Sequence, residues 1–140
     1  MKGDIIPNGE SLYRYIKPES LPEDQTEIPF SIFEDKELSC DWAKVQTEPE
    51  KSYHVAEGKN LILQILVCDE IKFPCNPKQP KQKQESWEQK VVHDPIKKGE
   101  DLTHTEIENE SHSLIQGLKR IHITTAIAQN TKVFKQVIIE

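Results

Sequence analysis

The sequence has no long apolar run and no apolar segment at its N-terminus. Its longest apolar stretch, residues 60–68, is far shorter than the roughly 20 residues of a membrane helix. Residues 1–9 lack the apolar core of a secretory signal. These absences predict a cytoplasmic protein that has no membrane partner.

Cysteine is scarce and aromatic residues are few. The three cysteines, Cys40, Cys68 and Cys75, form no C-x-x-C pair, which argues against a disulfide framework and against a zinc ribbon. Aromatic residues make up 6% of the chain and charged residues 30%. Leu, Ile, Val and Phe still account for 36 of the 140 residues, enough for one hydrophobic core. The composition predicts a single small domain, residues 1–140, with a thin core and solvated loops.

An excess of basic residues is also missing. Residues 1–60 contain thirteen acidic and seven basic residues, whereas residues 61–140 contain eleven of each. The net charge of −6 therefore lies in the N-terminal part. Sequence-independent nucleic-acid binding needs a cationic surface that releases counterions, so the charge argues against a nucleic-acid partner.

The apolar pattern predicts strands and one long helix. Strands are predicted for residues 12–16, 61–68 and 87–93, where aliphatic or alternating residues are bounded by proline or glycine. Ile107, Leu114, Ile115, Leu118 and Ile121 recur at spacings that form one face of a helix over 105–121. The sequence therefore predicts an α+β domain in which a few-stranded sheet packs against a helix in the C-terminal half.

The remaining segments are less regular. An acidic irregular arm, about residues 1–35, is predicted to wrap over the sheet, and the Pro, Lys and Gln residues of 73–86 predict a long exposed loop. Residues 43–59 have the pattern of a loop or short helix. Residues 121–139 fit either a hairpin or a helix followed by a strand.

The most informative polar residues lie where an apolar stretch ends at Pro95. His93 and Asp94 precede this proline, and His104 and Glu106 follow nine to eleven residues later. Together with His112 they contain the atoms of a divalent-metal site. Neither H-E-x-x-H nor H-x-H occurs, so we assign no metal ligand and leave the cofactor unknown.

The same histidines suit general acid–base chemistry. An imidazole group titrates near neutrality, and Asp94 or Glu106 could orient the ring of His93 or His104. Arg14 is a candidate for holding an anionic substrate. Together with Ser39 or Cys40, this set would suit a small hydrolase or transferase acting on a phosphorylated or nucleotide substrate, with Ser39, Asp41 and Asp94 as candidate binding residues. Cys40 could also be a nucleophile with a histidine as its base. The same pocket without turnover would be a ligand sensor.

A purely structural interpretation competes with these roles. In it, His93 and His104 bond to backbone groups around the Pro95 turn, and His112 faces solvent. Ser39 and Asp41 would cap a turn or a helix N-terminus, while Cys40 would be a small buried side chain.

Four short motifs carry a family resemblance. They are Leu12-Tyr13-Arg14, Phe33…Glu37-Leu38-Ser39-x-Asp41, Val92-His93-Asp94-Pro95 and Thr103-His104-Thr105-Glu106-Ile107. The set resembles a recurrent, largely uncharacterised family of small bacterial cytosolic proteins. That resemblance implies no activity, but it marks six residues for attention: Arg14, Ser39, Asp41, His93, Pro95 and His104.

The Leu12-Tyr13-Arg14 opening also resembles small ADP-ribosyltransferase-like domains. In those domains the arginine contacts the dinucleotide, and the likeness extends to Arg14 alone. Because no full catalytic set is readable, the leading functional hypothesis is a protein-interaction or accessory module with a protein partner. The hydrolase or transferase and the sensor, with a small molecule bound, remain the alternatives.

Overall fold

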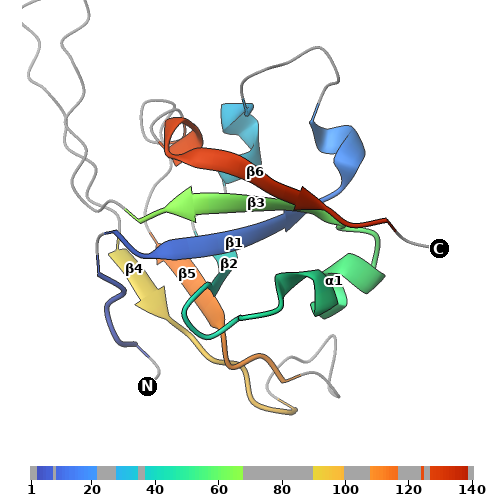
Figure 1. The fold of residues 1–140 in the computed structure, drawn as a ribbon. Helices are drawn as coiled ribbons and strands as arrows, with labels where there is room; N and C mark the ends of the chain where they lie inside the picture. The colour runs from blue at the N-terminus through green and yellow to red at the C-terminus, as the bar shows by residue number, and fades with distance from the viewer. Residues whose placement is uncertain are drawn as a thin grey trace, which may run out of the picture.

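The computed structural model describes residues 3–7, 9–21, 28–34, 37–67, 90–99, 108–116, 124 and 127–138. Within them, six strands form one antiparallel sheet in the order β4-β5-β2-β1-β3-β6 (Figure 1). The strands are β1 (Ser11–Ile16), β2 (Glu37–Trp42), β3 (Leu61–Leu66), β4 (Lys90–His93), β5 (His112–Gln116) and β6 (Thr131–Gln136). Short helices accompany them: η1 (Pro18–Ser20), η2 (Phe30–Phe33), η3 (Pro49–Lys51) and α1 (Tyr53–Ala56). Residues 127–129, just before β6, are also helical.

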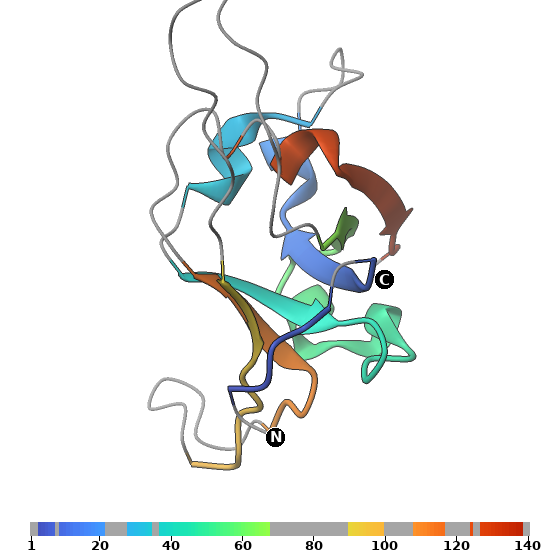
Figure 2. The same ribbon diagram turned by 90° about the vertical axis from the view of Figure 1, so that its left-hand side faces the viewer.

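Alternation along β3 divides the apolar side chains between the two faces of the sheet. Leu61, Leu63 and Ile65 enter the main core. Ile62 points to the other face and packs with Tyr15 and with Val55 of α1 in a smaller cluster. This two-residue period is that of a strand with both faces covered. In Figure 2 the helix η2 lies on the main-core side, and α1 lies on the opposite side.

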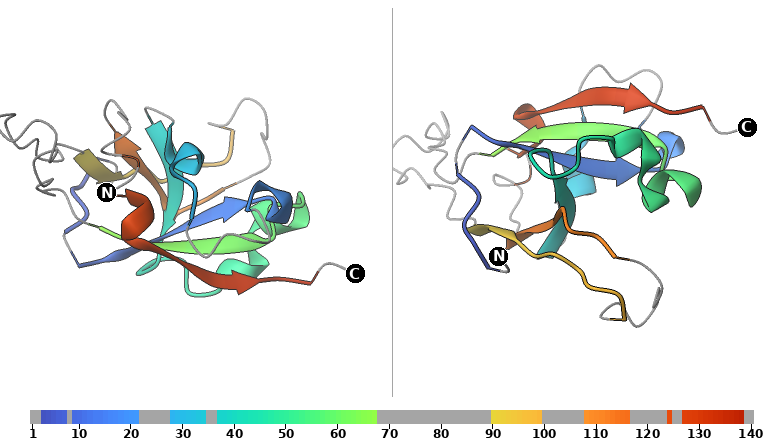
Figure 3. Two further views of the ribbon diagram at one scale, coloured as in Figure 1. Left: turned by 90° about the horizontal axis from the view of Figure 1, so that it is seen from above. Right: turned by 60° about the horizontal axis from the view of Figure 1, so that its bottom comes forward.

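The sheet is divided where β1 meets β2. These strands pair only at Leu12 with Trp42 and at Tyr13 with Asp41, whereas β1 pairs with β3 along its full length. Beyond these two pairs the strands separate. Figure 3 accordingly shows β2 and β5 crossing the strands β1, β3 and β6 at a steep angle. The sheet thus consists of two three-stranded halves, β4-β5-β2 and β1-β3-β6, that are joined by these two residue pairs.

The outer edge of β4 is covered by the chain itself. His93 N donates to Asp4 O at 2.8 Å, and Ile6 N donates to Val91 O at 2.9 Å. Ile5 also forms a bridge with Val92. Residues 3–6 therefore complete the hydrogen bonds of this edge, while β6 ends the described sheet on the other side.

The structure confirms the strands predicted around β1, β3 and β4 and the short helix predicted within residues 43–59. The predicted helix over 105–121 is wrong at residues 112–116, which form β5. Ile115 is buried in the main core, while His112, at the start of the same strand, lies on the other face. Residues 105–107 and 117–121, like the predicted loop 73–86, lie outside the described part.

Two further outcomes concern the ends of the chain, and the first is a correction. The strand expected within a peripheral N-terminal arm is β1, an interior strand of the sheet between β2 and β3. Of the two alternatives for the tail, the described residues fit the helix followed by a strand, since residues 127–129 are helical and β6 follows. Among the described residues, no helix has the length and apolar character needed to cross a membrane.

Candidate functional site

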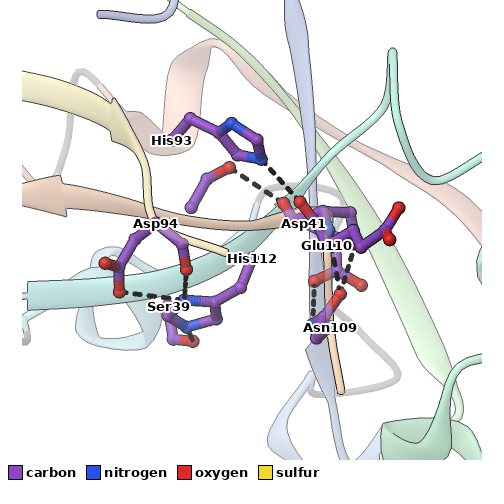
Figure 4. A network of polar contacts seen from close by, with 9 residues as sticks. Ser39, Asp41, His93, Asp94, Asn109, Glu110 and His112 are labelled. Carbon is purple, nitrogen blue, oxygen red and sulfur yellow. Dashed lines mark hydrogen bonds and ion pairs between the residues drawn. The ribbon is translucent and has the colours of Figure 1, made fainter. Parts of the chain in front are cut away.

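Ser39, His112 and Asp94 form a chain of polar contacts on the α1 side of the sheet (Figure 4). Ser39 Oγ lies 2.6 Å from His112 Nε2. His112 Nδ1 lies 2.8 Å from the Asp94 carbonyl oxygen and 3.2 Å from Asp94 Oδ2. Both neighbours of Nδ1 are acceptors, so we assign the ring proton to Nδ1. Nε2 then accepts the hydrogen bond from the Ser39 hydroxyl.

Strand pairing explains why these three residues meet. In the β2–β5 register, Asp41 is opposite His112 and Ser39 is opposite Leu114, so Ser39 and His112 are diagonal neighbours on one face. Asp94 directly follows β4, and its backbone N donates to His112 O at 2.8 Å. His112 is therefore attached to Asp94 by backbone and side-chain contacts, which fixes the orientation of the imidazole.

A second group of polar side chains lies beside the first and is centred on Asp41. Tyr15 Oη donates to Asp41 Oδ2 at 2.7 Å, and Asn109 Nδ2 donates to Asp41 Oδ1 at 2.8 Å. Asn109 Oδ1 in turn accepts from Ser111 Oγ at 2.6 Å. Asp41 is only 1% exposed. Because a buried carboxylate needs hydrogen bonds on both oxygens, Tyr15 and Asn109 make this burial tolerable.

Burial raises the pKa of Tyr15, and the adjacent Asp41 carboxylate raises it further. Tyr15 therefore remains a protonated donor. The ring of His54, from α1, stacks on the Tyr15 ring with centroids 5.0 Å apart. Burial also lowers the pKa of His54, so this histidine is held in its neutral form. Ser52 caps α1 by accepting from His54 N at 3.3 Å.

Arg14 is positioned where β1 and β2 separate. Its Nη1 donates to the Ser39 carbonyl oxygen at 2.8 Å. In a continuous antiparallel ladder this carbonyl would pair with a neighbouring strand, so the guanidinium supplies a donor near the point where the ladder ends. The contact also brings a positive charge to the residue that bonds to His112.

His93 is directed away from His112. Its Nε2 donates to the Glu110 carbonyl oxygen at 2.5 Å, and its ring meets the Trp42 ring edge-on with centroids 5.2 Å apart. The predicted pairing of His93 with His104 has no described geometry, because His104 and Glu106 lie outside the described residues. The structural interpretation predicted backbone bonds around the Pro95 turn; His93 does bond to a backbone group, but that group belongs to Glu110.

Three expectations for the remaining candidates are wrong. His112 does not face solvent, since only 8% of it is exposed. Ser39 and Asp41 lie within β2 and cap neither a turn nor a helix. The Cys40 thiol is buried in the main core on the opposite face, where it cannot act with His112 as a nucleophile.

The structure thus brings Ser39, Asp41 and Asp94 together around His112, which the sequence suggested only as a candidate metal ligand. Arg14 is connected to this group through its bond to the Ser39 carbonyl oxygen. Tyr15, Asn109 and His54 were missed, because nothing in the local sequence connects them. The described part of the chain contains no group of three or more His, Cys, Asp or Glu residues that could hold a metal ion. No protein-family model, curated protein or solved structure matches the chain.

Proposed function

We propose that the chain is a small hydrolase or transferase in which Ser39 is the nucleophile, His112 the general base and Asp94 the residue that orients the base. The observation that carries this proposal is the 2.6 Å contact between Ser39 Oγ and His112 Nε2, with Nδ1 directed at Asp94. A hydroxyl, a base within hydrogen-bond reach and a third group that orients the base are the recurring parts of an activated nucleophile. His112 takes the place that the sequence suggested for His93 and His104.

The proposed reaction has two steps. His112 Nε2 takes the hydroxyl proton as Ser39 Oγ bonds to the electrophilic atom of the substrate, and the imidazolium then gives this proton to the leaving group. Water, or an acceptor hydroxyl in a transferase, then attacks the covalent intermediate. His112 Nε2 accepts its proton and gives it to Ser39 Oγ as the bond between Ser39 Oγ and the substrate breaks, which restores the free enzyme. Asp94 keeps its contact with His112 Nδ1, and its side chain stabilises the transient positive charge on the ring.

Arg14 is the residue that suggests a phosphorylated or nucleotide substrate. Its Nη1 donates to the Ser39 carbonyl oxygen, while its side chain lies on the main-core face, because Arg14 pairs with Leu63. Its positive charge therefore acts on the Ser39 site through the backbone of Ser39 and would favour a substrate that carries an anionic group. The resemblance of Leu12-Tyr13-Arg14 to ADP-ribosyltransferase-like domains points to the same class of ligand. Tyr13 is partly exposed on the neighbouring strand and offers an aromatic surface to a base.

A fluorophosphonate probe tests the nucleophile directly. It phosphonylates activated serines, and intact-mass spectrometry of the full chain counts the groups added. We expect one adduct on the wild-type chain and none on Ser39→Ala or His112→Asn. Ser31→Ala is the matched control, because Ser31 is exposed on η2. Equal labelling of the wild type and Ser39→Ala would overturn the proposal.

Nicotinamide dinucleotide, tested with the full chain by calorimetry and by product analysis, separates the enzyme from the sensor. Binding with cleavage supports the transferase or hydrolase, whereas binding without chemical change supports the sensor. Arg14→Lys keeps the charge but loses the planar guanidinium, and we expect it to weaken the binding of this dinucleotide.

A second candidate function is the protein-interaction module. It is favoured by a different observation, the outer edge of β6.

A further inference from the structure

The two ends of the sheet differ in how their edges are covered. At β4, residues 3–6 satisfy the outer backbone groups. At the other end, no strand of the described residues pairs with the outer side of β6, which forms the free margin of the sheet in Figure 3. An uncovered strand edge is a template for pairing with another chain.

The hydrogen bonds of β3 show which groups of β6 point outward. Leu66 N donates to Asn130 O at 2.9 Å, and the register continues through Gln64 with Lys132. Hydrogen-bonded pairs alternate with non-bonded pairs in an antiparallel ladder. Lys132 therefore directs its backbone groups toward β3, whereas Thr131 and Val133 direct theirs away from it.

The side chains of β6 are both apolar and basic. Val133 is 47% exposed and Phe134 43% exposed, and Lys132 and Lys135 flank them with exposed side chains. Phe134 sits at a bulge, because Ile62 pairs with Lys135 and Leu63 pairs with Val133. Residues 127–138 contain no acidic residue, although the whole chain carries a net charge of −6.

We propose that β6 binds an extended acidic segment of a partner protein by β-strand addition. The backbone of that segment pairs with Thr131 and Val133. Its carboxylates meet Lys132 and Lys135 on the α1 face, and an apolar side chain rests on Val133 on the main-core face. Charge complementarity selects this occupant. A second copy is a poorer fit, because pairing Val133 with Phe134 of the other copy sets Lys132 opposite Lys135, and like charges directly opposite each other destabilise a strand pair.

Fluorescence anisotropy of the full chain with a labelled peptide tests this surface. The probe is a short extended peptide that alternates glutamate with valine, and its partner probe carries lysine in place of glutamate. We expect the acidic peptide to bind, its affinity to fall as salt is added, and the lysine peptide not to bind. Lys132→Glu with Lys135→Glu should weaken binding by about tenfold or more. The control, Lys97→Glu with Lys98→Glu, makes the same charge change on exposed residues beyond β4 and should leave the affinity within about twofold.

A second variant tests the backbone contact. Val133→Pro removes an outward N–H but no bond to β3, and proline is tolerated on edge strands. We expect this variant to keep its circular dichroism spectrum and to lose its binding of the peptide. If the variant unfolds, the charge variants decide.

Equal binding of both peptides, or unchanged binding by Lys132→Glu with Lys135→Glu, would overturn the proposal. A wild-type dimer in sedimentation velocity that Val133→Pro abolishes would instead make a second copy the occupant. His112→Asn should bind the peptide normally, which separates this surface from the Ser39 site.

Discussion

Replacing Tyr15 with phenylalanine tests whether the buried carboxylate of Asp41 depends on the Tyr15 hydroxyl. The change removes the donor that lies 2.7 Å from Asp41 Oδ2 and leaves only Asn109 bonded to the other oxygen. Hydrogen bonds to charged groups contribute about 1.5–3 kcal/mol, and solvent cannot replace this one because Asp41 is buried. We expect the free energy of unfolding to fall by about 2 kcal/mol. For a chain of 140 residues, that loss corresponds to a decrease of about 7 °C in Tm.

Urea and thermal denaturation followed by circular dichroism measure this loss. Tyr13→Phe is the matched control, because Tyr13 is on the same strand and partly exposed, and it should cost less than about 0.5 kcal/mol. The double variant with Asp41→Asn should show a coupling energy of about 1 kcal/mol or more, since the two residues are in direct contact. Equal effects of Tyr15→Phe and Tyr13→Phe would refute the reasoning, because the hydroxyl would then contribute nothing to the burial of Asp41.

The remaining predictions concern pH, packing and the nucleophile. The pKa of His54 in the folded chain is lowered by burial below its ordinary value of 6.5, so its contribution to stability is complete above about pH 6.5 and is lost as the pH falls below that value. His54→Phe keeps the stacked ring, so urea midpoints measured between pH 7 and 5 should change less than in the wild type; equal slopes would contradict this. Leu63→Ala, at a fully buried position of β3, should lower the free energy of unfolding in chemical denaturation by about 2–5 kcal/mol. Leu66→Ala, at an exposed position of the same strand, should lower it by less than about 1 kcal/mol. Similar losses for the two variants would mean that the core is misplaced. Asp94→Asn should slow fluorophosphonate labelling less than His112→Asn does, because the Asp94 carbonyl still accepts from His112 Nδ1; equal rates would show that the carbonyl does not hold the ring.

Much of the sheet could be predicted from the sequence because its strands follow local rules. β3 is a short aliphatic run, and β4 ends just before Pro95. β5 could not be found in this way. Its residues His112 and Ser113 are polar but buried, and Leu114 and Ile115 are adjacent apolar residues that face opposite sides. Apolar and polar residues therefore do not alternate along β5 as they do along a half-buried strand. The spacing of the nearby leucines and isoleucines predicted a helix instead.

The candidate site was only partly predictable for a related reason. Ser39 and His112 are 73 residues apart, and they meet because β2 pairs with β5. The motif around Pro95 drew attention to His93, but Asp94 is the residue of that motif that reaches His112. Adjacent residues of an extended chain point to opposite faces of a sheet. A shift of one residue, from His93 to Asp94, therefore decides which side chain reaches His112.

The unequal edges of the sheet also determine how far any assembly through them can grow. A chain with two open edges can pass strand pairing on to the next copy without limit, as in a fibre. Here residues 3–6 occupy the β4 edge, so strand addition at β6 stops after one partner and gives a complex of fixed stoichiometry. Removal of residues 3–6 would open a second edge and allow the growth to continue.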